Sequence, residues 1–326
     1  MVSEERSFKP KAKVDYLRVS VTDRCHFQCP YCAPAVRKLS KHADILTFEE
    51  IKAAARILSR LGVRKVRLTG GEPLLRKNID ALVRALKSVS GIESVNLTTN
   101  GHLLLEQAGA LREAGIDGVN VSLDSLDNEK YGRLTGGFSL EDSLSGIEEA
   151  LRLRITPLKI NVVLMKGVND DEVEGFCLKA SDLGCDLRFI ELMRTGENDS
   201  FVDRYFLQAA VIRDRLKERF HLIPSQRPGI SGPSQDFFSR DLGIMVGFIH
   251  SNDGKKCLDC TRMRLTSKGF LKRCLFSSGG FDLRHLLRSK ETEEEISDKV
   301  RRFTLLPEIL QETASLYHFS MMQIGG

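Results

Sequence analysis

Short apolar runs alternate with longer amphipathic segments through the first two thirds of this sequence. The runs are rich in β-branched residues, as buried strands are, and they are Tyr16–Val21, Val63–Thr69, Ser94–Thr98, Gly118–Leu123, Leu158–Leu164 and Asp186–Glu191. The segments between them have apolar residues at helical spacing, and they are Phe48–Leu61, Asn78–Ser88, Leu103–Ala114, Ser139–Arg152 and Asp170–Leu183. Such alternation predicts a parallel sheet with right-handed crossovers, either open or closed into a partial barrel.

The first amphipathic segment also carries a signal for where its helix begins. Thr47 places a hydroxyl just before the helix, and Glu50 follows three residues later, which is the spacing of a capping box. In folds of this class the chemistry lies at the carboxyl ends of the strands. The residues that follow each apolar run are therefore the first candidates for a functional site.

The pattern changes after Pro224. Residues Ser225–Ser239 are rich in Gly, Pro and Ser and predict a loop, and Gly243–His250 predicts a buried strand. Thr261–Thr266 and Phe270–Cys274 predict a hairpin. Glu291–Phe303 has the charge pattern of a surface helix.

These changes predict three parts of the chain. Residues 1–13 are polar and form a loose N-terminal arm, residues 14–224 form the α/β part, and residues 225–326 form a smaller, irregular C-terminal region. A chain of 326 residues is long enough for one large α/β domain with such an extension.

Composition narrows the function classes. A net charge of +5 is a mild excess that suits an anionic small molecule better than nucleic acid. No apolar stretch has the length of a membrane span, and the polar start has no signal-peptide core, so we expect a cytoplasmic protein without membrane contact. Eight cysteines in such a protein indicate metal ligands or buried thiols rather than disulfides.

Three cysteines follow the first strand within eight residues, at Cys25, Cys29 and Cys32. Thiolates at this spacing can converge on a soft-metal centre. A structural zinc site needs four ligands, whereas three thiolates on a [4Fe–4S] cluster leave one iron open. With the aromatic Tyr31 before the third cysteine, the segment resembles the cysteine motif of the radical S-adenosylmethionine (SAM) superfamily.

A glycine-rich turn follows the second strand, Thr69-Gly70-Gly71-Glu72-Pro73. Glycines permit close backbone approach, and a Glu can accept hydrogen bonds from an ammonium group. The turn alone is weak evidence, because many strand-to-helix turns look like it. Beside the cysteines it resembles the second signature of the superfamily, which holds the amino group of SAM.

A second cysteine group lies in the C-terminal region, at Cys257, Cys260 and Cys274. A pair at the spacing C-x2-C is common in zinc sites, and His250 is available as a fourth ligand. Three thiols again favour an iron–sulfur cluster with an open iron. The remaining Cys177 and Cys185 fall in a helix and before a strand, where buried thiols are ordinary.

Taken together, the motifs resemble a narrower family, the GTP 3′,8-cyclases of molybdenum cofactor biosynthesis. The likeness rests on the two cysteine groups, on the segments Leu68–Leu74 and Cys260–Leu265, and on the terminal Gly-Gly, and it extends from about Tyr16 to Gly326. The family fold is an incomplete (β/α)6 barrel of the TIM type, with a C-terminal extension that closes the mouth of the barrel.

The resemblance implies a reaction. It implies two [4Fe–4S] clusters, SAM as cofactor and GTP as substrate, with the adenosyl radical removing the ribose 3′ hydrogen before that carbon attacks guanine C8. It also implies an external one-electron donor and transfer of the product to the next enzyme of the pathway, and we expect a homodimer. The residues that it places around SAM are Tyr31, Gly71, Glu72, Thr98, Ser122 and Met193.

A triphosphate needs cations, and basic residues fall within the predicted strands. Charged residues inside a barrel are costly to bury unpaired, which favours a ligand role over a surface role. The predicted GTP-binding residues are Arg18, Lys65, Arg67, Lys159, Arg188, Arg262 and Arg264. In the family the diglycine end enters the active site, so the residues expected to act in catalysis are Arg18, Arg262, Arg264, Gly325 and Gly326.

Three other interpretations remain open on the sequence alone. Another radical SAM enzyme with auxiliary clusters, such as a peptide maturase, would be expected to have more than the three cysteines that this tail contains. A zinc-dependent binding protein would use both thiol groups structurally and would have no use for SAM. A nonenzymatic iron–sulfur sensor would not need the basic residues on the strands.

Overall fold

The computed structural model describes residues 14–32, 39–195, 198–225, 232–251, 260–275 and 279–305. The predicted N-terminal arm, Cys257, and the terminal Gly325 and Gly326 lie outside the described residues.

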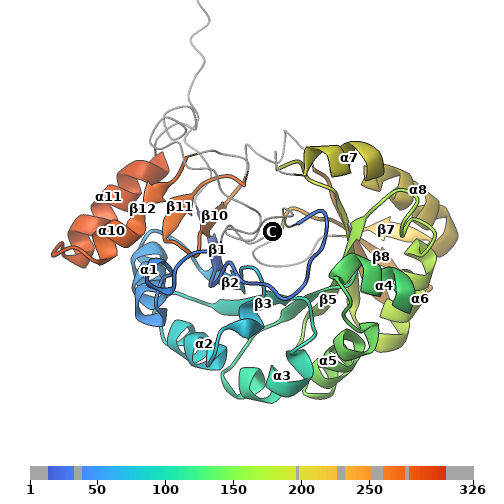
Figure 1. Ribbon diagram of the computed structural model, residues 1–326, viewed down its shortest axis with the longest axis horizontal. Coiled ribbons are helices and arrows are strands. Elements are labelled where there is room, and N and C mark those ends of the chain that lie inside the picture. Colours follow the sequence, from blue (N-terminus) through green and yellow to red (C-terminus); the bar gives the residue numbers. More distant parts are fainter. Residues whose placement is uncertain are drawn as a thin grey trace, which may run out of the picture.

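The six predicted strands form the centre of one sheet, parallel and in chain order (Figure 1). They are β1 (Tyr16–Ser20), β2 (Lys65–Thr69), β3 (Ser94–Thr99), β4 (Val119–Ser122), β5 (Leu158–Leu164) and β6 (Asp186–Glu191). The prediction of a parallel α/β fold is confirmed, with each boundary within two residues of the expected one.

The five predicted helices cover the outer face of the sheet (Figure 1). They are α1 (Phe48–Arg60), α2 (Ile79–Lys87), α3 (Leu104–Glu113), α5 (Leu140–Arg152) and α6 (Val173–Leu183). The capping box before α1 is present: Thr47 Oγ1 accepts from Glu50 N, and Glu50 accepts from Thr47 N.

The sequence pattern did not indicate several shorter elements. The 3-10 turns η1 (His42–Asp44) and η2 (Pro73–Leu75) lie in the loops after β1 and β2. The helix α4 (Asn128–Thr135) follows β4, and α7 (Asp199–Tyr205) and α8 (Ala209–Phe220) follow β6.

Strands that follow β6 in the chain extend the same sheet at both edges. Beyond β6 lie β9 (Ile244–Ile249), then β8 (Gln235–Ser239) and β7 (Leu222–Pro224), with β9 parallel to β6. Beyond β1 lie β10 (Arg262–Leu265), then β11 (Phe270–Lys272) and β12 (Phe281–Asp282), with β10 parallel to β1.

These strands confirm two predictions and correct one. The buried strand at Gly243–His250 is β9, and the hairpin of Thr261–Thr266 with Phe270–Cys274 is the antiparallel pair of β10 and β11. The expected loop Ser225–Ser239 is wrong in its last residues, because Gln235–Ser239 pairs with β9 as strand β8. Strands before and after residue 224 belong to the same sheet. The division of the chain into domains at this residue therefore stays a prediction.

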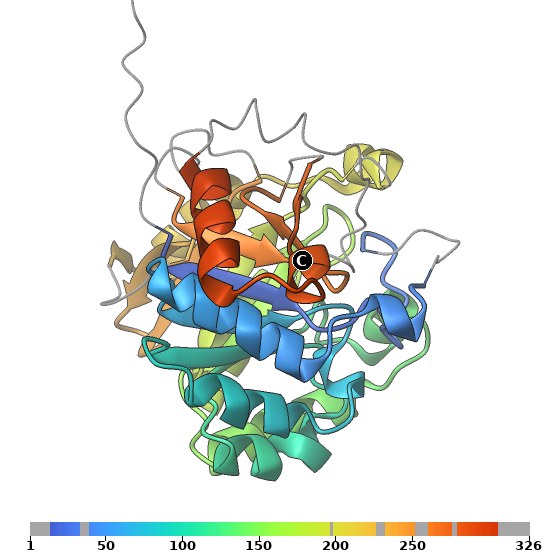
Figure 2. The same cartoon turned by 90° about the vertical axis from the view of Figure 1, so that its left-hand side faces the viewer.

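The sheet curves into an open arc, and its ends do not close into a barrel (Figure 1). The helices α10 (Leu283–Leu287) and α11 (Glu293–Leu305) pack against α1, as Figure 2 shows in red and blue. The charged helix expected at Glu291–Phe303 is therefore confirmed as α11. Within the described residues, no helix has the length and apolarity needed to cross a bilayer.

Alternation along the strands sorts the residues into two faces. Leu17, Val19, Val66 and Leu68 are fully buried in the apolar core beneath the helices. The residues between them point to the concave side, where polar and basic side chains line a cavity. This is why strands that look mainly apolar in sequence also carry charges at alternate positions.

Candidate active site

A cavity of about 600 Å³ opens on the concave side of the sheet, at the carboxyl ends of its strands. It brings together most of the residues that the sequence indicated. Those that line it are Arg18, Cys25, Cys29, Tyr31, Cys32, Lys65, Arg67, Gly71, Glu72, Thr98, Ser122, Lys159, Arg188, Met193, Arg262 and Arg264.

The three N-terminal cysteines lie in a turn at the mouth of this cavity. The turn closes with a bond from Cys32 N to Cys29 O of 3.1 Å, and Gln28 N donates to Thr135 O at 2.8 Å. Burial raises the pKa of the Cys29 thiol well above its ordinary value, and Asp124, Cys32 and Cys25 raise it further. All three thiols line the same cavity.

The donor chemistry of the cysteine turn suits an iron–sulfur cluster. Thiolates are the ligands that such clusters take, and all three thiols line one cavity. The donor set of Cys25, Cys29 and Cys32 therefore fits such a cluster.

The glycine-rich turn packs against the cysteine loop. Gly71 N donates to Thr22 O at 2.8 Å, and Glu72 N donates to Arg24 O at 2.7 Å. A Cβ at Gly70, whose φ is +152°, would lie 2.4 Å from the Thr22 oxygen. The two glycines are thus needed so that the backbones of the two loops can touch.

Glu72 lies behind this contact with its carboxylate held in place. Its oxygens accept from Leu74 N at 3.0 Å, Thr99 Oγ1 at 2.7 Å and Asn100 N at 2.8 Å. Burial raises its pKa to about 7, although these donors oppose the shift. A ligand ammonium beside it would favour the charged form.

The other residues expected around SAM lie at the ends of neighbouring strands. Thr98 accepts a long 3.4 Å hydrogen bond from Arg67 Nη1, and it is the register partner of Asn120 on β4. Ser122 ends β4. The Met193 carbonyl accepts from Asn198 Nδ2 at 3.0 Å, which fixes the loop after β6.

The basic residues of the first strands form two rows across the sheet. In one row Arg18 on β1 has Arg264 of β10 on one side and Arg67 of β2 on the other. In the other row Tyr16 stands between Arg262 and Lys65. Strands β10, β1 and β2 thus present five cationic side chains and one phenol to the cavity.

Crowding of these charges shifts their pKa values. Burial, together with the charges of Arg18 and Arg262, lowers the pKa of Arg264 to about 9. Burial and Arg67 lower the pKa of Arg18 as well. A polyanion in the cavity would relieve this repulsion.

The same positive charges favour the ionised form of Tyr16. Burial would raise the pKa of its phenol, but the charges of Arg67, Arg18 and Lys65 outweigh burial and lower it to about 7. Arg67 Nε donates to the phenol oxygen at 2.8 Å, and the Lys65 ammonium lies 5.4 Å from the ring centre.

The two remaining basic residues lie on the far side of the cavity. Lys159 on β5 is 8% exposed and lies 3.5 Å from Asp186 Oδ2, so it has a structural ion pair as well as access to the cavity. Arg188 on β6 is the register partner of Gly247 on β9.

Gly247 lies between Arg188 on β6 and Asp236 on β8. Gly247 in turn pairs with Asp236 on β8, which also lines the cavity. A Cβ at Gly247 would lie 2.6 Å from Asp236 Oδ1 and 3.5 Å from Arg188 Nε. The missing side chain lets the two charged groups converge above this strand.

Two of the C-terminal cysteines are described, Cys260 and Cys274. They precede β10 and follow β11, so the hairpin brings them to the same end of the sheet. Arg262 Nε donates to Cys260 Sγ at 3.3 Å. Cys177 and Cys185 are buried, and burial raises the pKa of each to about 12, as ordinary core thiols.

His250 has partners for both ring nitrogens. Nδ1 lies 3.1 Å from Glu191 Oε1, and Nε2 lies 3.3 Å from Gln235 Oε1. This favours a satisfied polar group over the zinc ligand that the sequence left open.

Sequence reasoning missed three polar residues near the site. Asp124 and Asn198 line the cavity beside the cysteine turn, and they fall in loops where no motif marks them. Lys272 on β11 is the register partner of Arg264 and is 2% exposed. The hairpin pattern could have placed Lys272 beside Arg264, because the two strands pair antiparallel.

Two family models match the chain. The model described as the radical SAM superfamily matches residues 19–180. The model described as Molybdenum Cofactor Synthesis C matches residues 185–305.

Curated relatives are similar over nearly the whole chain. A GTP 3′,8-cyclase of Pelotomaculum thermopropionicum is 38% identical over 96% of this chain and 98% of its own length. A GTP 3′,8-cyclase of Thermodesulfovibrio yellowstonii is 40% identical, with the same coverage of both chains.

A solved structure shares the fold. SuiB of Streptococcus suis bound to S-adenosylmethionine aligns with a TM-score of 0.61 over 89% of this chain and 68% of that chain, at 14% identity. Likeness at this identity supports the architecture alone.

Proposed function

The chain belongs to the GTP 3′,8-cyclase family, and we propose that its cavity converts GTP into a 3′,8-cyclised guanine nucleotide, the first step of molybdenum cofactor biosynthesis. As a member of the radical SAM superfamily it uses SAM and an iron–sulfur cluster. The observation that carries the proposal is the single cavity in which a three-cysteine turn faces rows of arginine and lysine.

Cys25, Cys29 and Cys32 would hold the cluster that cleaves SAM, and this cluster supplies the electron for that cleavage when bound. Tyr31, Gly71, Glu72, Thr98, Ser122 and Met193 would surround SAM. Support comes from the hydrogen bonds between the glycine turn and the cysteine loop, and from Glu72 lining the same cavity as the cysteines.

GTP would lie across the basic rows. Arg18, Arg262 and Arg264 would neutralise the triphosphate together with Lys65, Arg67, Lys159 and Arg188. The support is electrostatic: neighbouring buried guanidinium groups repel one another, and a bound polyanion would offset that repulsion.

A second [4Fe–4S] cluster would be held by Cys257, Cys260 and Cys274. The hairpin of β10 and β11 supports this by bringing Cys260 and Cys274 to the same end of the sheet. Gly325 and Gly326 would enter the cavity, as in the family. We further propose a cytoplasmic homodimer that takes electrons from an external donor and passes its product to the next enzyme of the pathway.

The test uses anaerobically purified, cluster-reconstituted protein with dithionite and SAM. Formation of 5′-deoxyadenosine and of nucleotide products is measured with and without GTP. GTP-dependent 5′-deoxyadenosine together with a cyclised guanine nucleotide is the expected result. Deoxyadenosine with unchanged GTP would leave the superfamily standing and refute the cyclase.

A further inference from the structure

Tyr31 connects the cysteine turn to two other loops. It lies between Cys29 and Cys32, and its hydroxyl donates a short hydrogen bond to Asp124 Oδ2, beyond the end of β4. Its backbone carbonyl accepts from Asn198 Nδ2 at 2.9 Å. The loops after β1, β4 and β6 therefore meet at one residue.

Asp124 is itself fixed from the neighbouring strand. Its second carboxylate oxygen accepts from Val163 N on β5 at 2.8 Å, so both oxygens have donors. Its backbone carbonyl accepts from Asn169 Nδ2 at 2.7 Å. The side chain is 7% exposed, and it reaches the cavity wall.

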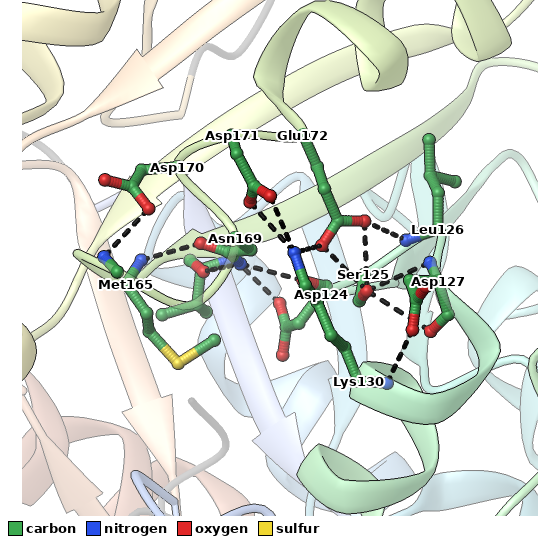
Figure 3. Close-up of polar contacts among 12 residues, drawn as sticks. Asp124, Ser125, Leu126, Asp127, Lys130, Met165, Asn169, Asp170, Asp171 and Glu172 are labelled. Atoms are coloured by element: carbon green, nitrogen blue, oxygen red, sulfur yellow. Dashed lines mark hydrogen bonds and ion pairs between the residues drawn. The ribbon is translucent and has the colours of Figure 1, made fainter.

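Asn169 is fully buried and holds the backbone of Asp124 by a hydrogen bond. Its Nδ2 also donates to Val163 O at 2.9 Å, and its Oδ1 accepts from Met165 N at 2.8 Å. Figure 3 shows Asn169 between Met165 and Asp124. Of these three hydrogen bonds, the one to Asp124 O joins the loop after β5 to the loop after β4, and the other two hold the Asn169 side chain in place.

A second group of contacts, made by Glu172, holds the other side of the same loop (Figure 3). Glu172 accepts from Ser125 Oγ at 2.9 Å and from Leu126 N, and it pairs with Lys130 Nζ at 3.2 Å. Lys130 also pairs with the exposed Asp171 at 2.9 Å. Two independent contacts therefore fix the segment that presents Asp124.

We propose that Asp124 is a positioning residue for SAM binding: it holds the Tyr31 phenol, and through it the cysteine turn, in the place that the cofactor requires. A charged acceptor that is buried and fixed on two sides gives a stronger and more directional bond than a neutral one. The inference rests on the proposed assignment of the cysteine turn to a cluster. It concerns a residue that no motif marks.

The experiment compares Asp124→Asn, Tyr31→Phe and the double variant with the wild-type protein. In each reconstituted protein the dissociation constant for SAM is measured. In each cluster-free protein, hydrogen exchange is measured over residues 25–32. Each single variant is expected to weaken SAM binding about tenfold and to speed exchange in that segment, because each removes the same charge-assisted bond.

The double variant shows whether Asp124 acts through Tyr31 or independently of it. If Asp124 acts through Tyr31, the double variant binds SAM no more weakly than the weaker single variant. Losses that multiply would overturn the proposal, because the two residues would then act separately. So would a loss with Asp124→Asn and none with Tyr31→Phe, since Asp124 would then contact the cofactor on its own.

A matched control lies in the same network. Asp171→Asn removes the exposed partner of Lys130 and leaves Asp124 and Tyr31 untouched, so it should change neither SAM binding nor exchange. Iron content and the unfolding midpoint identify a variant that fails to fold. Wild-type protein that binds neither iron nor SAM would count against the proposed function, and the exchange comparison would still test the link between Asp124 and the turn.

Discussion

Gly71 lies so close to Arg24 that a Cβ atom on it would be 2.2 Å from the Arg24 carbonyl oxygen. The same atom would be 3.0 Å from Cys25 N. The obstacle is backbone, which cannot rotate away as a side chain can. Any side chain at Gly71 would therefore push the cysteine loop away from the glycine turn.

We predict that Gly71→Ala displaces the cysteine loop. The substitution should lower the free energy of unfolding by about 1–3 kcal/mol, as overpacking does, and should reduce the iron retained after reconstitution. Chemical denaturation of the cluster-free protein and iron analysis measure the two effects.

Gly109→Ala is the matched control. Gly109 lies in α3, and a Cβ there would meet nothing within 4 Å. An alanine at this partly exposed helix position should raise the unfolding free energy by about 0.5–1 kcal/mol. Equal losses from both substitutions would show that steric contact at Gly71 is not the cause.

The sequence predicted the sheet well because strand and helix periods differ strongly in this chain. Leu158–Leu164 is mostly apolar and is found as β5 with the same bounds. The strand β8 was missed because its polar residue Asp236 faces a cavity rather than solvent, and the Gly, Pro and Ser before it suggested a loop. A one-dimensional pattern cannot separate these two surroundings.

The site was predicted unevenly for a related reason. Residues in motifs, such as Cys29 and Glu72, could be chosen from spacing alone. Asp124 could not, because its role depends on Tyr31, which is 93 residues away in the chain. The Asp186 partner of Lys159 is likewise a product of the pairing between β5 and β6, which sequence spacing does not show.

Arg264 is predicted to bind GTP rather than to support the fold. Arg264→Ala should lower kcat/KM for GTP by about tenfold to a hundredfold, the range expected for a lost hydrogen bond to a charged group. The dissociation constant for SAM should stay that of the wild type. Arg262→Ala should behave in the same way, because both side chains line the cavity from β10.

Arg60→Ala provides the comparison for these variants. Arg60 is a surface residue whose side chain is 50% exposed and lies 3.5 Å from Glu293. Its loss should change kcat/KM for GTP little, because exposed ion pairs contribute weakly. Normal GTP turnover by both Arg262→Ala and Arg264→Ala would contradict the substrate site proposed above.

The phenol of Tyr16 should make stability depend on pH. Its pKa is about 7 in the folded protein and near 10 in the unfolded chain, so folding favours the phenolate. This contribution is fully present above pH 10 and is lost as the pH falls through 7. The difference in unfolding free energy between wild type and Tyr16→Phe should therefore grow as the pH rises from 7 to 10.

Absorbance of tyrosinate gives a direct measurement of the same group. One of the five tyrosines should ionise near pH 7 in the wild type, and this step should be absent in Tyr16→Phe. Arg67→Met should move the step to higher pH, because Arg67 is the strongest of the charges that lower this pKa. The absence of any tyrosine ionisation near pH 7 in the wild type would refute the assignment.

Gly247 is predicted to set the place of Arg188 in the cavity. A Cβ there would lie 2.3 Å from Ser234 Oγ and 2.6 Å from Asp236 Oδ1, and both are ends of side chains that can move. Gly247→Ala should therefore fold, but with Asp236 and Arg188 displaced. We expect KM for GTP to rise about tenfold, as for one weakened charge-assisted bond, with SAM binding unchanged.

Gly175→Ala in α6, where the nearest atom would be 3.7 Å away, should leave KM as it is. An unchanged KM in Gly247→Ala would mean that Arg188 does not need this neighbour to bind the nucleotide.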